Sequence, residues 1–263
     1  MKRVLASLLT LLVVLSGAVA GTPATGVTNP DGFRAAEPWH VSLWVKDLNG
    51  GPDRQTCGGA LIAPQWVLTA AHCISDSAIA YARIGDDLDG KRLEVSFRVT
   101  HSRYNKETYI NDIGLVVLGE PADATPIQLP PLQDGPLLQL ESLSVMGWGE
   151  DQNGIAPGTL AFARQQDLTS QADKFFDVFN PELQIAAGRY IERERVYSGA
   201  CRGDSGGPLV ATFGATQVLV GVVSYGSTDC NSARPTVYSR VSGYLDFIDE
   251  ALRDVVVPGT PGS

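Results

Sequence analysis

Short apolar runs separated by turn residues make up most of the chain and restrict the folds open to it. The clearest runs occupy residues 41–45, 66–69, 113–118, 218–224 and 236–240, with Gly, Pro, Asn or Asp residues between them. Such runs are typical of strands in a β-sandwich or β-barrel. Because strand and helix patterns do not alternate along the chain, a doubly wound parallel sheet is disfavoured. The pattern therefore predicts an all-β fold.

One α-helix is predicted at the carboxyl-terminal end. Four apolar residues recur there at helical spacing and form one stripe: Val241, Leu245, Ile248 and Leu252. We expect a helix over residues 241–254 that docks this stripe on the rest of the protein. The last residues, 255–263, are rich in Pro and Gly and are predicted to form a flexible tail.

The first twenty residues have the composition of a secretory signal peptide. Lys2 and Arg3 precede an almost wholly apolar stretch over residues 4–15, and the small residues Ala-Val-Ala follow at 18–20. Removal of residues 1–20 changes the formal net charge from −9 to −11, which argues against nucleic acid as a partner. No later run is long enough to span a membrane. We expect a secreted, extracellular protein without membrane association after this cleavage.

Three motifs contain a histidine, an aspartate and a serine in that order. They read Thr-Ala-Ala-His-Cys at 69–73, Asn-Asp-Ile-Gly-Leu at 111–115 and Gly-Asp-Ser-Gly-Gly-Pro at 203–208. A serine hydroxyl needs a base to take its proton, and the base needs a third group to orient it. His72, Asp112 and Ser205 therefore predict a hydrolase with a serine nucleophile.

The order of the histidines decides between two classes of serine hydrolase. Residues 203–207 also match Gly-x-Ser-x-Gly, the nucleophile motif of α/β-hydrolases such as esterases, in which the catalytic histidine follows the serine. The chain's histidines are His40, His72 and His101, and all precede Ser205. This excludes the α/β-hydrolase. His40 and His101 lie outside any motif, and we interpret both as structural.

The three motifs resemble those of the trypsin-like, chymotrypsin-fold serine proteases. Further matching segments lie at 57–62 (Cys-Gly-Gly-Ala-Leu-Ile), 66–68 (Trp-Val-Leu), 146–149 (Met-Gly-Trp-Gly) and 224–226 (Ser-Tyr-Gly). The resemblance extends from about Trp39 to the terminal helix. It implies one peptidase domain over residues 21–263, built from two six-stranded antiparallel β-barrels. A Pro- and Gly-rich interval, roughly 120–136, divides them at about 26–130 and 131–240, with the active site in the cleft between.

The resemblance assigns a role to each motif residue. Ser205 would attack the scissile carbonyl, His72 would accept and later return its proton, and Asp112 would orient the imidazole. The backbone N–H groups of Gly203 and Ser205 would form the oxyanion hole. Ser224 would support Asp112. The expected enzyme is a secreted endopeptidase that forms an acyl-enzyme and acts on peptides or proteins, with a protein inhibitor as a further class of partner.

Five residues are expected to bind substrate: Gly199, Ser224, Tyr225, Gly226 and Thr236. By resemblance, Gly199 lies at the base of the specificity pocket, where it offers no carboxylate to a substrate Arg or Lys. Gly226 leaves the mouth of the pocket open and pairs with the substrate backbone, whereas Thr236 reduces the depth. The predicted preference is for small to medium apolar residues before the scissile bond, with Phe or Tyr second.

Four cysteines, an even number in an exported chain, predict two disulfides. Cys57 and Cys73 bracket the histidine motif, and Cys201 and Cys230 bracket the serine motif, so pairing within each half would brace both loops. Metal binding is disfavoured because no short-spaced Cys and His cluster is present. Asp86, Asp87 and Asp89 are interpreted as a solvated turn rather than a calcium loop. The expected enzyme has no metal and no cofactor.

The amino terminus departs from the family pattern. Relatives begin with a sequence like Ile-Val-Gly-Gly, freed by cleavage after a basic residue, and the new amino group pairs with the aspartate before the nucleophile, here Asp204. This chain reads Thr-Gly-Val-Thr-Asn at 25–29, without Lys or Arg between Gly21 and Phe33. Three routes stay open: the signal-peptidase terminus inserts, another protease cuts near Thr25, or Asp204 has another partner. A latent or catalytically silent binding protein on the same fold is therefore the alternative hypothesis.

Overall fold

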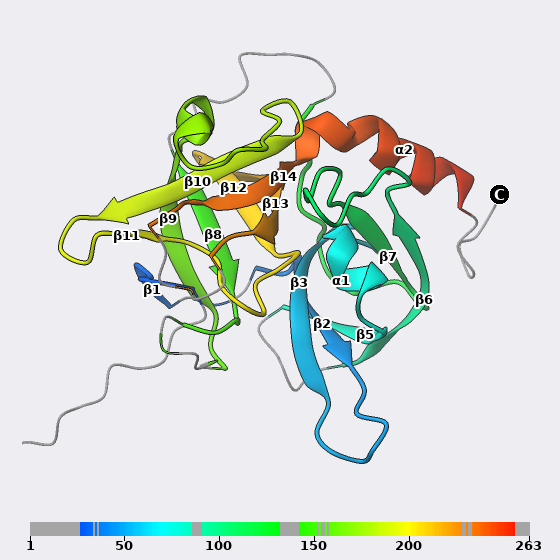
Figure 1. Ribbon diagram of the computed structural model, residues 1–263. Helices are drawn as coiled ribbons and strands as arrows, with labels where there is room; N and C mark the ends of the chain where they lie inside the picture. Colours follow the sequence, from blue (N-terminus) through cyan, green and yellow to red (C-terminus); the bar gives the residue numbers. More distant parts are fainter. Residues whose placement is uncertain are drawn as a thin grey trace, which may run out of the picture.

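The computed structural model describes residues 27–33, 35, 37–85, 91–131, 142–151, 153, 156, 158–227, 230 and 233–255. In this part of the chain two antiparallel barrels lie side by side, and the carboxyl-terminal helix packs beside them (Figure 1). The predicted signal peptide, the group Asp86, Asp87 and Asp89, and the tail from 256 onward lie outside the described residues. Among the described helices, none has the length and hydropathy needed to cross a membrane.

Six strands close the first barrel in the order β2-β3-β4-β7-β6-β5. They are β2 (His40–Val45), β3 (Arg54–Ala63), β4 (Trp66–Thr69), β5 (Ile79–Ile84), β6 (Leu93–Thr100) and β7 (Gly114–Leu118). Every residue of β4 and β7 is buried, which explains why their sequences are continuous apolar runs rather than alternating ones. A five-residue helix, α1 (Ala71–Ser75), follows β4 directly.

The second barrel also has six strands. Its order is β9-β8-β12-β13-β14-β10, and pairing of β9 with β10 closes it. The strands are β8 (Leu143–Gly147), β9 (Ala161–Asp167), β10 (Gln184–Ile191), β12 (Pro208–Phe213), β13 (Thr216–Tyr225) and β14 (Thr236–Arg240). Strand β11 (Val196–Ser198) pairs antiparallel with the end of β10, and a 3₁₀ helix, η1 (Thr169–Lys174), follows β9. The predicted fold class, two six-stranded antiparallel barrels, is confirmed.

The segment before β2 belongs to the second barrel, not to the first. Strand β1 (Gly32–Phe33) pairs with β9, and Thr28 forms a bridge with Gly199. Val27 is fully buried in the core of the second barrel. The predicted extent of the first barrel, residues 26–130, therefore began too early, because its first residues belong to the second barrel. Local turn and strand signals do not reveal which barrel a short strand will join, because that choice depends on a long-range pairing.

The interval between the barrels contacts both of them. Ile127 is buried in the first core and donates its N–H to Leu61 O, while Gln128 O accepts the N–H of Leu219 on β13. The terminal helix differs from the single α-helix expected over 241–254. It begins as a 3₁₀ turn, η2 (Val241–Tyr244), and continues as α2 (Leu245–Asp254). Its apolar stripe packs into a buried cluster that contains residues of both barrels, and the periodicity had predicted such docking on the rest of the protein.

Candidate active site

Strand pairing in the first barrel brings the histidine and aspartate motifs together. β4 and β7 are hydrogen-bonded neighbours, and Thr69 at the end of β4 lies opposite Gly114 at the start of β7. His72 follows β4 on α1, and Asp112 precedes β7. Both side chains therefore leave the same end of the strand pair. The antiparallel register, rather than any sequence proximity, makes them neighbours.

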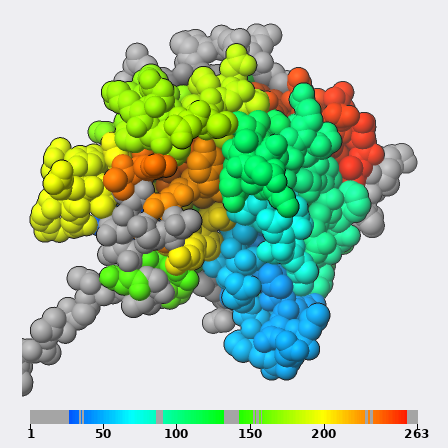
Figure 2. All heavy atoms as spheres, viewed as in Figure 1, coloured from blue at the N-terminus to red at the C-terminus, as the bar shows by residue number. Residues whose placement is uncertain are grey.

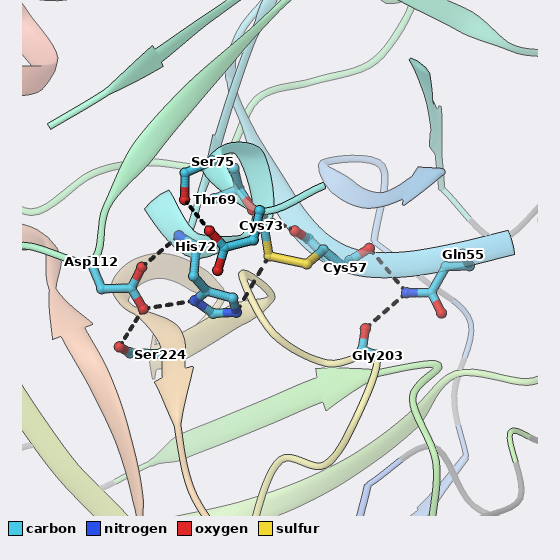
Figure 3. The surroundings of a disulfide bond; sticks show 11 residues. Gln55, Cys57, Thr69, His72, Cys73, Ser75, Asp112, Gly203 and Ser224 are labelled. Carbon is cyan, nitrogen blue, oxygen red and sulfur yellow. Dashed lines mark hydrogen bonds and ion pairs between the residues drawn. A yellow bond between two sulfur atoms is a disulfide. The ribbon is translucent and has the colours of Figure 1, made fainter. Parts of the chain in front are cut away.

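The carboxylate of Asp112 holds His72 at two points. Oδ2 accepts from the ring Nδ1 at 2.8 Å, and Oδ1 accepts from the backbone N–H of His72 at 2.9 Å (Figure 3). Asp112 is fully buried. A carboxylate only accepts hydrogen bonds, so the neutral imidazole carries its proton on Nδ1 and leaves Nε2 as the basic nitrogen. Nε2 lies 3.7 Å from Cys73 Sγ.

Two serines of the second barrel complete the surroundings of Asp112. Ser224 Oγ, on β13, donates to Oδ2 at 2.6 Å, as the resemblance implied. Ser239 Oγ, on β14, donates to the backbone carbonyl of Asp112 at 2.6 Å. Ser239 was not among the predicted site residues, because β14 contains no sequence motif that would indicate this contact. The aspartate is thus anchored to both barrels.

Ser205 lies on the loop that connects Cys201 to β12. Its carbonyl accepts the N–H of Gly58 on β3 at 2.7 Å, which attaches this loop to the first barrel. The next residue, Gly206, donates its N–H to Val223 O on β13 at 2.8 Å. No hydrogen bond joins Ser205 Oγ to His72 Nε2 in the described part of the chain. Catalytic hydrogen bonds are often long in unliganded enzymes and shorten when substrate binds.

The backbone at Gly203 adopts a conformation that favours glycine. Gly203 has φ +92°, a conformation that side-chain-bearing residues rarely adopt, and a Cβ there would lie 2.9 Å from Gly149 Cα. Within the described residues, no protein acceptor takes the N–H of Gly203 or of Ser205. Two free N–H groups beside a serine hydroxyl are the arrangement that stabilises a developing oxyanion.

Both cysteine pairs are disulfide-bonded in the structure. Cys57–Cys73 joins β3 to α1 beside His72, as Figure 3 shows, and Cys201–Cys230 bridges the serine loop to the segment after β13. The histidine and serine segments are therefore each tied covalently to a neighbouring element.

Two of the predicted pocket residues, Gly199 and Gly226, lie beside the hydroxyl of Thr236. A Cβ on Gly199 would overlap Thr236 Oγ1, and one on Gly226 would lie 3.6 Å from it. The same oxygen accepts the N–H of Ala200 at 3.2 Å, which fixes its direction. Thr236 is buried, so its side chain fills space between the two glycines.

An aromatic wall beside His72 was missed by sequence reasoning. The ring of Tyr109 packs edge-on against the ring of His72, with 5.9 Å between the ring centroids, and lies tilted against Tyr225 at a centroid distance of 5.3 Å. The ring of Tyr225 in turn packs edge-on against Phe176, with 5.8 Å between the centroids. Tyr225 was predicted as a substrate-binding residue, but Tyr109 and Phe176 lie in loops with no motif. The available signal for Tyr109 is its place three residues before Asp112. Its φ of +56° turns the backbone there.

Asp204 is fully buried directly before the serine. Oδ1 accepts the N–H of Gly149 at 2.8 Å, and Oδ2 accepts the N–H of Cys201 at 2.9 Å. Burial raises its pKa to about 8 despite these two hydrogen bonds. A carboxyl with so high a pKa is protonated at neutral pH unless a cation reaches it.

Comparison with known proteins identifies the family of this chain. The family model for Trypsin matches residues 28–248. The chain is 35% identical to chymotrypsin of Phaedon cochleariae over 217 residues, which cover 76% of this chain and 73% of that protein. It is 34% identical to chymotrypsin-C of Bos taurus over 248 residues, covering 86% and 88% of the two chains. With chymotrypsin-C of Mus musculus the identity is 35% over 238 residues, or 82% and 84%.

The chain therefore belongs to the trypsin family of serine proteases, and it is a serine-type endopeptidase. Figure 2 shows the face on which its first barrel, blue to teal, meets the yellow and orange segments of the second.

Proposed function

We propose that His72, Asp112 and Ser205 form the catalytic triad of this endopeptidase. The observation that carries the proposal is the buried chain of hydrogen bonds from Ser224 through Asp112 to His72 Nδ1. It leaves Nε2 as the base that takes the Ser205 proton. The Ser205 oxygen then attacks the scissile carbonyl, and the imidazolium formed is stabilised by the Asp112 carboxylate. The proton passes to the leaving amine, and water hydrolyses the acyl-enzyme by the reverse path.

The N–H groups of Gly203 and Ser205 receive the negative oxygen of each tetrahedral intermediate. Because both donors are free of protein acceptors, no internal hydrogen bond has to break when the oxyanion forms. Preorganised donors of this kind stabilise the transition state without a reorganisation cost.

The preferred residue before the scissile bond is small to medium and apolar. Gly199 supplies no carboxylate for a basic side chain, and the Thr236 side chain occupies the depth beside it. Gly226 and Tyr225 lie on the strand edge that pairs with the substrate backbone. Efficient cleavage only after Arg or Lys would contradict this proposal.

Peptides and proteins outside the cell are the proposed substrates. The leader-like composition of residues 1–20 supports export, and the acidic mature chain with two disulfides fits an extracellular setting. A protein inhibitor that occupies the substrate-binding surface is a further proposed partner.

Activation is proposed to proceed through Asp204. Val27 is buried, and Thr28 donates its N–H and hydroxyl to Gly199 O at 2.9 and 3.1 Å, at the base of the proposed pocket. An amino terminus freed close to Val27 would place an ammonium near Asp204 and lower its raised pKa. Without such a cation the buried carboxyl favours the second candidate, a latent form of the same enzyme.

Labelling with a fluorophosphonate tests the proposed triad. The folded protein should react at Ser205, and Ser205→Ala should abolish labelling while leaving the fold intact. A peptide mixture varied at the residue before the scissile bond, read by mass spectrometry, then measures the preference. Labelling that persists in Ser205→Ala would contradict the assignment of the nucleophile.

A further inference from the structure

Gln55 connects the two barrels at the loop of the proposed oxyanion hole. It lies on β3 of the first barrel, and its amide nitrogen Nε2 donates to Gly203 O at 2.8 Å and to Cys57 O at 3.0 Å (Figure 3). Both hydrogens of the amide nitrogen are thereby used, so the side chain is oriented with its NH₂ group toward the two carbonyls. Gln55 lies outside every sequence motif of the site.

The two peptide groups that flank Gly203 are held from opposite barrels. Arg202 O, in the peptide before Gly203, accepts the N–H of Glu150 from the second barrel at 2.6 Å. Gly203 O, in the following peptide, accepts from Gln55 of the first barrel. A peptide group is rigid and planar, so the fixed Arg202 carbonyl directs the Gly203 N–H to the opposite side. Because glycine has no side chain, sterics alone do not fix the backbone dihedrals of Gly203 at φ +92°. The hydrogen bonds to its two flanking peptide groups fix them instead.

We propose that Gln55 is a positioning residue for catalysis, which holds the Gly203 peptides so that the oxyanion donors point at the reacting carbonyl. The inference rests on the proposed function, because the direction of these N–H groups matters only if they bind an oxyanion. Both printed hydrogen bonds of Gln55 go to backbone carbonyls, of Gly203 and Cys57, so we infer that it acts through the backbone at Gly203. Since the oxyanion exists only in the transition state and intermediates, loss of Gln55 should lower kcat and leave KM nearly unchanged.

Gln55→Met tests the proposal, with Gln65→Met as the matched control. Methionine keeps the length of the side chain and removes the donor. Gln65, buried in the same barrel, makes the same kind of hydrogen bond, from Nε2 to Leu118 O at 3.1 Å, away from the site. Loss of an oxyanion donor itself costs about 10²–10³ in kcat. Gln55→Met should therefore lose about 10- to 100-fold in kcat on an amide substrate, while Gln65→Met keeps the wild-type kcat.

Gln55→Glu tests whether the hydrogen-bond donor at residue 55 affects catalysis, because a merely structural role would not make the effect on kcat depend on pH. A glutamate carboxylate would face two carbonyl oxygens and repel both, whereas a protonated glutamic acid can donate one hydrogen bond. The ratio of the variant's kcat to that of wild type should rise as pH falls from 8 toward 5. Because the two proteins differ only at residue 55, pH effects that they share cancel in the ratio. A ratio independent of pH would overturn the proposal.

Failure of the proposed function is distinguishable from failure of this inference. If wild type does not react with a fluorophosphonate, either the enzyme is in its latent form or the triad proposal fails, and in both cases hydrogen exchange still tests Gln55. The N–H groups of Glu150 and Asp204 are protected by hydrogen bonds of this loop to Arg202 O and Cys201 O. They should exchange faster in Gln55→Met than in wild type or Gln65→Met. Equal exchange rates in Gln55→Met and wild type would overturn the inference. If wild type is active, a kcat of Gln55→Met within twofold of the wild-type kcat would also overturn it.

Discussion

Ser224 Oγ donates a 2.6 Å hydrogen bond to Asp112 Oδ2 although the two residues belong to different barrels and lie 112 positions apart. The acceptor is the same oxygen that receives His72 Nδ1. The orientation of the imidazole therefore depends on how the barrels pack against each other. Gln55 makes the reciprocal connection, from the first barrel to the serine loop of the second.

Replacement of Asp112 by Asn should reduce turnover by about 10⁴-fold, the loss that the corresponding change causes in this family. An amide NH₂ in place of the accepting oxygen would stabilise the wrong imidazole tautomer, with the proton on Nε2. Steady-state kcat on an amide substrate measures this, with circular dichroism as a check on folding. A loss of only a few-fold would contradict the role given to Asp112.

Ser224→Ala should lower kcat/KM by about 10- to 100-fold, because hydrogen bonds to charged groups contribute about 1.5–3 kcal/mol. Ser96→Ala is the matched control. Ser96 Oγ donates to Val117 O on β7 at 3.1 Å, and no hydrogen bond in the described part of the chain joins Ser96 to Asp112 or His72, so its loss should change only stability. Equal activities for the two variants would show that Ser224 does not support the aspartate.

Thr236→Gly should shift the cleavage preference toward larger residues such as Phe and Tyr. The change frees the space that the threonine side chain occupies beside Gly199, and each methylene accommodated in such a pocket discriminates by about 1–3 kcal/mol. Profiling of cleaved peptides by mass spectrometry measures the shift. Thr236→Ser keeps the hydroxyl that accepts from Ala200 and should change the preference much less. An unchanged profile for the glycine variant would remove Thr236 from the pocket.

The stability of a chain that still carries the residues before Val27 should fall as pH rises. Burial raises the folded-state pKa of Asp204 to about 8, well above the unfolded value of about 4. Protonation therefore stabilises the folded state fully below about pH 4, and this contribution is lost as pH rises through about 8. The total change is on the order of several kcal/mol for a shift of this size.

Urea unfolding between pH 4 and 9, in a Ser205→Ala background that prevents self-cleavage, measures this dependence. Asp204→Asn should flatten it, because an amide does not titrate. In a processed chain the trend should reverse, since an ammonium beside Asp204 stabilises the carboxylate. Identical pH profiles for Asp204→Asn and its parent would show that Asp204 does not control the stability of the unprocessed form.

Particular elements show where sequence reasoning succeeded. The predicted strands at 41–45, 66–69 and 236–240 match β2, β4 and β14 within one residue, because buried strands concentrate apolar residues between turn signals. The short β1 and the 3₁₀ start of the terminal helix were not predicted. The strand β1 has only two residues, too few to show a periodic pattern. The change from 3₁₀ to α hydrogen bonding occurs within one turn of the terminal helix, which alters the spacing of apolar residues too little to be recognised.

The amino-acid sequence by itself determined the proposed chemistry: a serine in a glycine-rich turn, a histidine that precedes it and an aspartate between them, on a chain of short strands. Only the tertiary structure decided which further groups serve these three. Ser239, Tyr109 and Gln55 contact the site through strand pairings and loop packing over long sequence separations. A serine, a tyrosine or a glutamine can occupy many surface positions, so residue type alone carries no signal. These contacts arise because closure of two barrels places their donors and rings beside Asp112, His72 and Gly203.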